Sequence, residues 1–100
     1  MARIMMITAG LLVAMHALLG TNPVHAESGL ASYYSARGMT CAHRTRPLGS
    51  MVTVSHNGRS IQCRVSDRGP FIRGRIIDVS VSAARALGMM QAGVVRVSLE

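Results

Sequence analysis

The stretch Arg64-Val-Ser-Asp-Arg-Gly-Pro-Phe-Ile-Arg-Gly-Arg-Ile-Ile-Asp-Val-Ser80 decides the fold of this chain. It holds two of the four acidic residues of the sequence, Asp67 and Asp78, and four of the eleven basic residues, all arginines. The pair Gly69-Pro70 is typical of a turn and separates two runs rich in β-branched residues. An acidic residue at the end of a strand, beside a rigid turn and among cations, indicates a functional site.

The segment before Asp67 has the alternation of a half-buried β-strand. Ile61, Cys63 and Val65 alternate with polar residues at period two, and Asp67 falls on the apolar parity. We therefore expect its carboxyl group on the barrel or cleft side, where burial favours the protonated form and neighbouring arginines favour the ionised form. Such a group can donate and accept a proton, so Asp67 is predicted to be catalytic. The alternative is that Asp67 caps the following turn through its own backbone, and the two roles are compatible.

The first 26 residues have the pattern of a secretory signal peptide. Arg3 gives the positive start, residues 4–20 are mostly apolar, and Val24-His25-Ala26 provides a cleavage site with small residues. An uncleaved membrane anchor is the competing interpretation of this run. We expect cleavage, no stable membrane anchor afterwards, and a protein that is secreted into the periplasm or associated with the cell wall.

Residues 27–100 then form one small domain, which can bury only a limited core. Two cysteines, Cys41 and Cys63, belong to it. In an exported chain an isolated pair predicts a disulfide, although two separate buried thiols remain an alternative. Two cysteines alone do not predict a metal site.

The net charge of +7 comes from arginine, because the chain has no lysine. This charge predicts an anionic partner. We expect no nucleic acid, since the chain is exported and has only Tyr33, Tyr34 and Phe71 for stacking on bases. An acidic glycan fits better, because guanidinium groups bind carboxylates in bidentate fashion and muramic acid of peptidoglycan carries a carboxylate. A solvated basic surface accounts for some of the arginines in any case.

The remaining elements follow from local signals. Strands are predicted over 29–35, 51–55, 60–66, 75–79 and 93–99, and Asn57-Gly58 predicts a type I′ hairpin turn. Ser80 is the expected N-cap of a short helix over 81–87 that Gly88 ends. Asp78 lies just before this cap and is interpreted as structural, because its charge suits a helix N-terminus.

Two further features concern side chains that could line a site. Tyr33 and Tyr34 point to opposite faces of the first strand, so one is expected in the core and the other beside a sugar-binding groove. His43 lies in the segment 40–49, predicted as a loop or single helical turn, and the expected disulfide would bring it near Asp67. A packed, hydrogen-bonded loop residue is the alternative role for His43.

These segments resemble the rare lipoprotein A-like family of double-psi β-barrels. The resemblance rests on five segments that cover nearly all of residues 27–100, namely Gly29-Leu-Ala-Ser-Tyr-Tyr34, Thr40-Cys-Ala-His-Arg-Thr-Arg-Pro-Leu-Gly49, Val65-Ser-Asp-Arg-Gly-Pro-Phe71, Gly74-Arg-Ile-Ile-Asp-Val-Ser80 and Ala83-Ala-Arg-Ala-Leu-Gly88. It implies a mainly β fold, a small six-stranded double-psi barrel with one short helix. It also implies lytic transglycosylase activity on peptidoglycan glycan strands that lack stem peptides, without a metal or other cofactor.

Carried over to this chain, the family's active-site aspartate is Asp67 and the histidine of its Ala-His loop is His43. We expect Arg44, Arg46, Arg68, Arg73 and Tyr34 to bind substrate, and Cys41, Cys63, Asp78, Gly69 and Pro70 to be structural. One departure matters: family enzymes place a Thr-Ala-x-Gly-Glu segment, with an active-site Glu, between the first strand and the Ala-His loop. Here Ser35-Ala-Arg-Gly38 leads straight to Met39, without an acid.

Three functions therefore stay open at this point. The first is a monomeric enzyme that cleaves peptidoglycan strands, with Asp67 as acid and base and His43 as an orienting or proton-sharing partner. The second is a glycan-binding module without catalysis, and the third is a protein-interaction or inhibitor barrel of the same fold. Glu27 is expected at a mobile terminus and Glu100 at the opposite end, so neither is expected to replace the missing Glu.

Overall fold

The computed structural model describes residues 26–100, which form a closed β-barrel with one short helix. The predicted signal peptide therefore lies outside the described residues, apart from Ala26. The elements are β1 (Glu27–Tyr34), β2 (Thr40–Ala42), β3 (Met51–His56), β4 (Arg59–Asp67), β5 (Arg75–Ser80), α2 (Val81–Leu87) and β6 (Val95–Leu99). The prediction of a six-stranded barrel with one short helix is confirmed.

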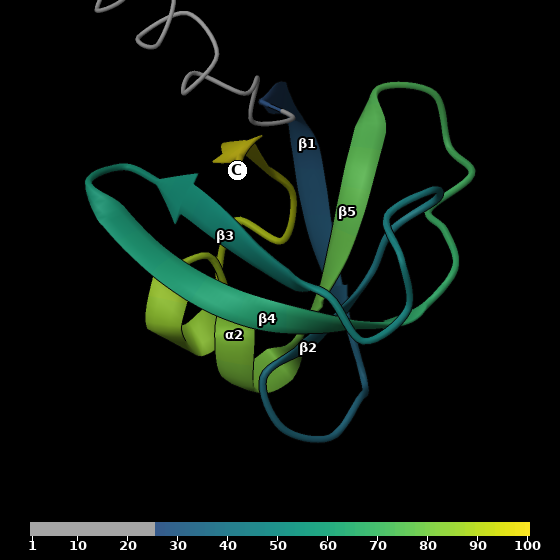
Figure 1. Ribbon diagram of the computed structural model, residues 1–100. Helices are drawn as coiled ribbons and strands as arrows, with labels where there is room; N and C mark the ends of the chain where they lie inside the picture. Colours follow the sequence, from purple (N-terminus) through teal and green to yellow (C-terminus); the bar gives the residue numbers. More distant parts are fainter. Residues whose placement is uncertain (1–25) are drawn as a thin grey trace, which may run out of the picture.

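The strands close in the spatial order β1-β5-β2-β4-β3-β6. β1 pairs with β5 and β2 pairs with β4 in parallel, whereas the other neighbours are antiparallel. Figure 1 shows β1 and β5 side by side, with α2 lying under β4. Because β5 sits between β1 and β2, residues far apart in the sequence become neighbours across the sheet.

Alternating apolar side chains fill the barrel, as period-two patterning requires when one face of each strand is buried. Val52 and Val54 of β3 and Val65 of β4 are at most 1% exposed, and so are Ile77 and Val79 of β5. Ala83, Ala84 and Leu87 of α2 complete this core from outside the sheet. The residues that alternate with them on the same strands point outward, where their side chains can line a site.

Local signals placed the hairpin and the helix correctly. Asn57 and Gly58 both have positive φ, 49° and 81°, as a type I′ turn requires. The Ser80 side chain accepts a hydrogen bond from the Ala83 N–H, and Gly88 ends the helix in the left-handed conformation, with φ 73°. The N-cap and C-cap predictions are both confirmed.

A disulfide joins Cys41 of β2 to Cys63 of β4, with 5.7 Å between their Cα atoms. Both residues are fully buried. The prediction from export and an isolated pair is confirmed. The bond fixes the short strand β2 to β4, whose last residue is Asp67.

Two expectations for the chain ends and loops were wrong. The segment expected as a loop or helical turn begins with a strand, Thr40–Ala42, because pairing with both β4 and β5 supplies hydrogen bonds that local sequence does not reveal. Glu27 is the first residue of β1, in register with Leu99 of β6, and is not a mobile terminus. Within residues 26–100 no helix is long and apolar enough to cross a membrane.

Candidate active site

A row of four residues crosses four neighbouring strands on the outer face of the barrel. Ser32 of β1 is in register with Asp78 of β5, Asp78 with Ala42 of β2, and Ala42 with Asp67 of β4. We call these four residues the carboxylate row. It places the two aspartates of the 64–80 stretch on either side of one alanine.

Asp78 points away from the core, because its neighbours Ile77 and Val79 are fully buried. Its Oδ1 accepts a hydrogen bond from the Ser32 hydroxyl. The capping contact to the helix comes from Ser80 instead. The Asp78 side chain therefore makes no capping hydrogen bond to α2. It is hydrogen-bonded to Ser32 of β1 instead.

Asp67 is exposed, so its side chain does not face the barrel interior, which was one of the two sides expected for it; the other was a cleft. The reason is a register shift: Cys41 pairs with Val65, but the next residue, Ala42, pairs with Asp67, so Ser66 is skipped. A bulge of this kind re-aims the side chains beyond it. The Asp67 Oδ1 accepts the Arg68 N–H over 2.8 Å, which is the local turn contact considered from sequence.

Tyr34 lies near both aspartates, whereas the Tyr33 hydroxyl donates to the Met90 carbonyl over 2.9 Å and its ring packs on the core. Burial raises the pKa of the Tyr34 hydroxyl, and the charges of Asp67 and Asp78 raise it further, while a hydrogen bond with Ser66 lowers it. The two tyrosines thus take opposite faces, as alternation predicts. Tyr34 is the one beside the carboxylate row.

The backbone of His43 is hydrogen-bonded to the backbone of Asp67, but the His43 ring makes its hydrogen bonds to other residues. The His43 N–H donates to the Asp67 carbonyl over 3.1 Å. The ring Nδ1 accepts the N–H groups of Thr45 (3.1 Å) and Arg46 (3.0 Å), and Nε2 lies 2.9 Å from Oε1 of Glu27. Because Nδ1 accepts these two hydrogen bonds, the ring hydrogen is on Nε2, which donates a hydrogen bond to Oε1 of Glu27. The buried ring, 3% exposed, therefore fits an orienting role better than proton sharing with Asp67.

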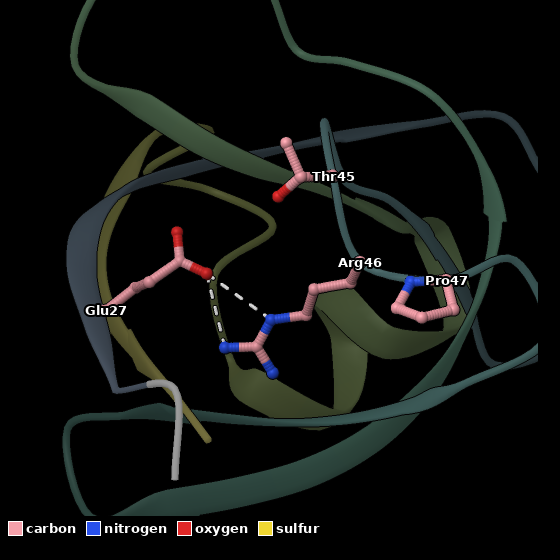
Figure 2. Close-up of a pocket in the computed structure, with 4 residues that line it drawn as sticks. All are labelled: Glu27, Thr45, Arg46 and Pro47. Carbon is pink, nitrogen blue, oxygen red and sulfur yellow. Dashed lines mark hydrogen bonds and ion pairs between the residues drawn. The ribbon is translucent and has the colours of Figure 1, made fainter. Parts of the chain in front are cut away.

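Glu27 and Arg46 form the polar wall of a pocket of about 220 Å³ that Thr45 and Pro47 also line. Figure 2 shows the Arg46 guanidinium turned toward the Glu27 carboxylate, with Nε and Nη2 at 3.3 and 3.2 Å from Oε1. Arg46 Nη1 also donates to the Glu100 carbonyl over 3.0 Å. Sequence reasoning missed this role of Glu27, because only barrel closure brings β1 to the His43 loop.

The four arginines expected to bind substrate occupy different surroundings. Arg68 Nη1 donates to the carbonyls of His43 (3.1 Å) and Arg46 (2.6 Å), so it holds the loop after β2. Arg44 Nη2 donates to the Arg75 carbonyl over 2.6 Å and ties the same loop to β5. Arg73 is exposed in the segment between β4 and β5. Arg73 is thus the best placed of the four to meet a ligand directly.

The segment after Asp67 presents apolar side chains to solvent. Phe71 is 79% exposed and Ile72 57% exposed, whereas Gly69 and Pro70 are buried beneath them. Gly69 and Pro70 thus form the buried part of this segment. An exposed aromatic ring four residues from a candidate acid is a platform on which the apolar face of a sugar ring can stack.

Residues 26–100 contain no group of three or more His, Cys, Asp or Glu side chains arranged to hold a metal ion. The chemistry that the carboxylate row offers is proton transfer, with two carboxyl groups, two hydroxyl groups and arginines nearby.

Comparison with known proteins gives the same family as the sequence motifs. The sequence profile of the lytic transglycolase family matches residues 25–99. A probable endolytic peptidoglycan transglycosylase RlpA of Nostoc sp. is 51% identical over 69 residues, which cover 67% of this chain and 19% of that protein. An endolytic peptidoglycan transglycosylase RlpA of Pseudomonas aeruginosa is 49% identical over 69 residues, 67% of this chain and 20% of that protein. This chain therefore spans about a fifth of the length of these relatives.

Solved structures confirm the double-psi barrel. The apo expansin of Clavibacter michiganensis aligns with a TM-score of 0.65 at 22% identity, covering 75% of this chain and 49% of the expansin. A Streptomyces papain inhibitor aligns with a TM-score of 0.62 at 26% identity, covering 80% of this chain and 97% of the inhibitor. The same barrel thus occurs in proteins of different named activities, as expected of a widely used fold.

Proposed function

This chain belongs to the lytic transglycolase family, and from that membership we propose that it cleaves the glycan strands of peptidoglycan by an intramolecular route that leaves an anhydro end. We propose strands without stem peptides as the substrate. The protein acts as a monomer outside the cytoplasm, in the periplasm or at the cell wall. The named activity of the relatives, at 49–51% identity over the matched barrel, supports this assignment.

The observation that carries the proposal is the position of Asp67. Its carboxyl group is exposed at the end of β4, on the outer face of the barrel, where a polymer can reach it. Phe71 and Arg73 follow it on one exposed segment. An acid, an aromatic ring and a cation on one surface match a sugar polymer that carries carboxylates.

The proposed reaction needs no water and no cofactor. Asp67 donates its proton to the glycosidic oxygen as the bond from that oxygen to the anomeric carbon breaks. The 6-hydroxyl oxygen of the same muramyl residue bonds to the anomeric carbon, and its proton is taken up by a carboxylate. One proton leaves the enzyme and one is taken up, so the number of protons on the enzyme is unchanged by the reaction.

His43 and Arg68 serve this site as positioning residues. Arg68 binds the carbonyls of His43 and Arg46, and the His43 N–H binds the carbonyl of Asp67. The loop after β2 is thereby fixed against the strand that carries the acid. Arg73 is proposed to bind a muramyl carboxylate.

The test is mass spectrometry of purified, peptide-free glycan strands after incubation with the protein. Anhydro-ended fragments support the proposal, and reducing-ended fragments would indicate a hydrolase instead. Asp67→Asn keeps the side chain's shape but cannot donate the proton, so we expect cleavage to fall by at least about 10²-fold while glycan binding persists. Glu100→Gln, which removes the same charge at the chain end, is the matched control and should cleave normally.

A non-catalytic or inhibitory barrel is the second candidate. The absence of the Thr-Ala-x-Gly-Glu segment favours it, and so does the fold shared with a papain inhibitor, 97% of whose chain is covered. Intact strands that are nevertheless retained by the protein would indicate a glycan-binding module. Intact strands that are not retained, together with loss of papain activity on mixing, would indicate an inhibitor.

A further inference from the structure

The chain lacks the glutamate that the resemblance leads one to expect, so a site with two carboxyl groups has to take the second one from elsewhere in the barrel. The described residues include four acids, Glu27, Asp67, Asp78 and Glu100. Glu27 is occupied by His43 and Arg46. Glu100 lies beside Thr53 of β3, with which its backbone exchanges two hydrogen bonds of 2.9 and 3.0 Å. Asp78 is the remaining acid, and it shares the carboxylate row with Asp67.

We propose that Asp78 is the second catalytic carboxylate, which takes the proton from the attacking 6-hydroxyl while Asp67 protonates the leaving oxygen. This inference rests on the proposed function and names the group that completes it. The proposed pair of carboxyl groups needs no residue before β1 or after β6. The site is then complete within β1, β2, β4 and β5.

Register supports this pairing of Asp67 with Asp78. Both are in register with Ala42, one on each side of β2. Neighbouring strands lie about 4.8 Å apart, so the two backbones are separated by roughly 9.5 Å. The carboxyl groups of inverting glycosidases are about 6.5–9.5 Å apart, so a spacing of this size is one at which two carboxyl groups act on a single glycosidic bond. Both aspartates lie on the outer face of the barrel, within this one row.

The residue between the two acids is small. Ala42 follows the buried Cys41 and so belongs to the outer face, where its methyl group adds little height. Although it is on the outer face, it is only 3% exposed, so neighbouring side chains close over it.

Two hydroxyl groups support the assignment of roles. The Ser32 hydroxyl donates to Oδ1 of Asp78 and so orients that carboxyl group from β1. Asp67 lies at the exposed end of its strand, where it can reach the leaving oxygen of a bound polymer. The second hydroxyl group is that of Tyr34, whose pKa is raised by burial and, to a smaller extent, by the charges of both aspartates.

The step balances with these two groups alone. The bond from the anomeric carbon to the glycosidic oxygen breaks with proton transfer from Asp67. The new bond joins the anomeric carbon to the 6-oxygen, whose proton passes to Asp78. Exchange with solvent then restores a protonated Asp67 and an ionised Asp78.

The experiment compares wild type, Asp67→Asn, Asp78→Asn and Glu100→Gln on peptide-free glycan strands, with mass spectrometry for products and thermal melting for folding. Asn at position 78 can still accept the Ser32 hydrogen bond, so we expect an unchanged melting temperature, retained glycan binding and cleavage lower by at least about 10²-fold. Asp78→Ala should regain part of its activity in formate, which supplies a small exogenous base. A merely structural Asp78 would show no such rescue.

The outcomes separate the two levels of the proposal. If wild type yields no anhydro-ended fragments, the proposed function fails and Asp78 loses its role with it. If wild type cleaves, Asp67→Asn is inactive and Asp78→Asn cleaves at the wild-type rate, the role of Asp78 alone is overturned. If Asp78→Asn proves unfolded, the formate response of Asp78→Ala and the rate of Asp78→Glu decide: absence of activity in both overturns the proposal.

Discussion

The His43 ring donates its Nε2–H to Oε1 of Glu27 over 2.9 Å, and this contact joins the loop after β2 to the first residue of β1. Glu27 begins β1, whereas His43 follows β2, and the two strands are separated in the sheet by β5. Both nitrogens of the ring are used within the loop and by Glu27. His43 is thus fixed as part of the framework behind Asp67.

Removing the Glu27 carboxylate should destabilise the barrel. Glu27→Ala leaves the buried Nε2–H of His43 without an acceptor, and a buried unpaired donor costs about 1–3 kcal/mol. We expect a lower melting temperature in thermal denaturation. Glu27→Gln is the matched control, because its amide oxygen can still accept the proton, and its loss should be smaller. Equal melting temperatures for Glu27→Ala and wild type would contradict the role assigned to this contact.

Arg68 and Arg73 should respond differently to the same substitution. Arg68→Ala removes the guanidinium that bridges the carbonyls of His43 and Arg46, so we expect a loss of about 1–2 kcal/mol in unfolding free energy. Arg73→Ala should leave the melting temperature unchanged and weaken glycan binding. Salt should reduce the difference in binding between Arg73→Ala and wild type, since exposed charges are screened. The idea fails if Arg73→Ala lowers stability and leaves binding intact.

Reduction of the disulfide should destabilise the protein more than either arginine change. The bond between Cys41 and Cys63 spans 22 residues of sequence, for which the chain-entropy model gives about 3 kcal/mol. Since about 1 kcal/mol moves the melting temperature of a domain this small by about 4–8 °C, we expect a fall of more than about 10 °C. Melting with and without reductant measures it, and thiol titration of native protein should find no free thiols. An unchanged melting temperature in the fully reduced protein would be the contrary result.

Tyr34 offers a readout of the two aspartates that does not depend on activity. Its pKa is raised above the ordinary value of 10.0 by burial and by the charges of Asp67 and Asp78. In a Tyr33→Phe background, ultraviolet titration should therefore show a Tyr34 pKa that falls when either aspartate is changed to Asn. Glu100→Gln should leave it unchanged. A Tyr34 pKa indifferent to Asp78→Asn would place that carboxylate away from the site.

The same shift has a consequence for stability at high pH. The folded state favours the protonated phenol, so its contribution is fully present below pH 10 and is lost as the pH rises through the raised pKa of the folded state. We expect the melting temperature to fall above pH 10. Tyr34→Phe should show less of this alkaline fall than wild type.

The sequence by itself determined the elements whose causes are local. Asn57-Gly58 specified the hairpin because both residues accept positive φ, Ser80 and Gly88 specified the two ends of α2, and period-two patterning specified the core faces of the long strands. Motifs over nearly all of residues 27–100 were enough to indicate the family and the barrel. Export and an isolated cysteine pair were enough to predict the disulfide.

Only the tertiary structure decided which of these residues meet. A skipped Ser66 turned Asp67 to the outer face, and a bulge of that kind arises from pairing with β2, which local periodicity cannot show. Closure of the barrel in the order β1-β5-β2-β4 brought Asp78 beside Asp67 and Glu27 to His43. Contacts between strands distant in sequence depend on register, and register is set by the whole closed sheet. Local sequence therefore predicted Asp78 as a helix-terminal residue, whereas the structure places it in the carboxylate row.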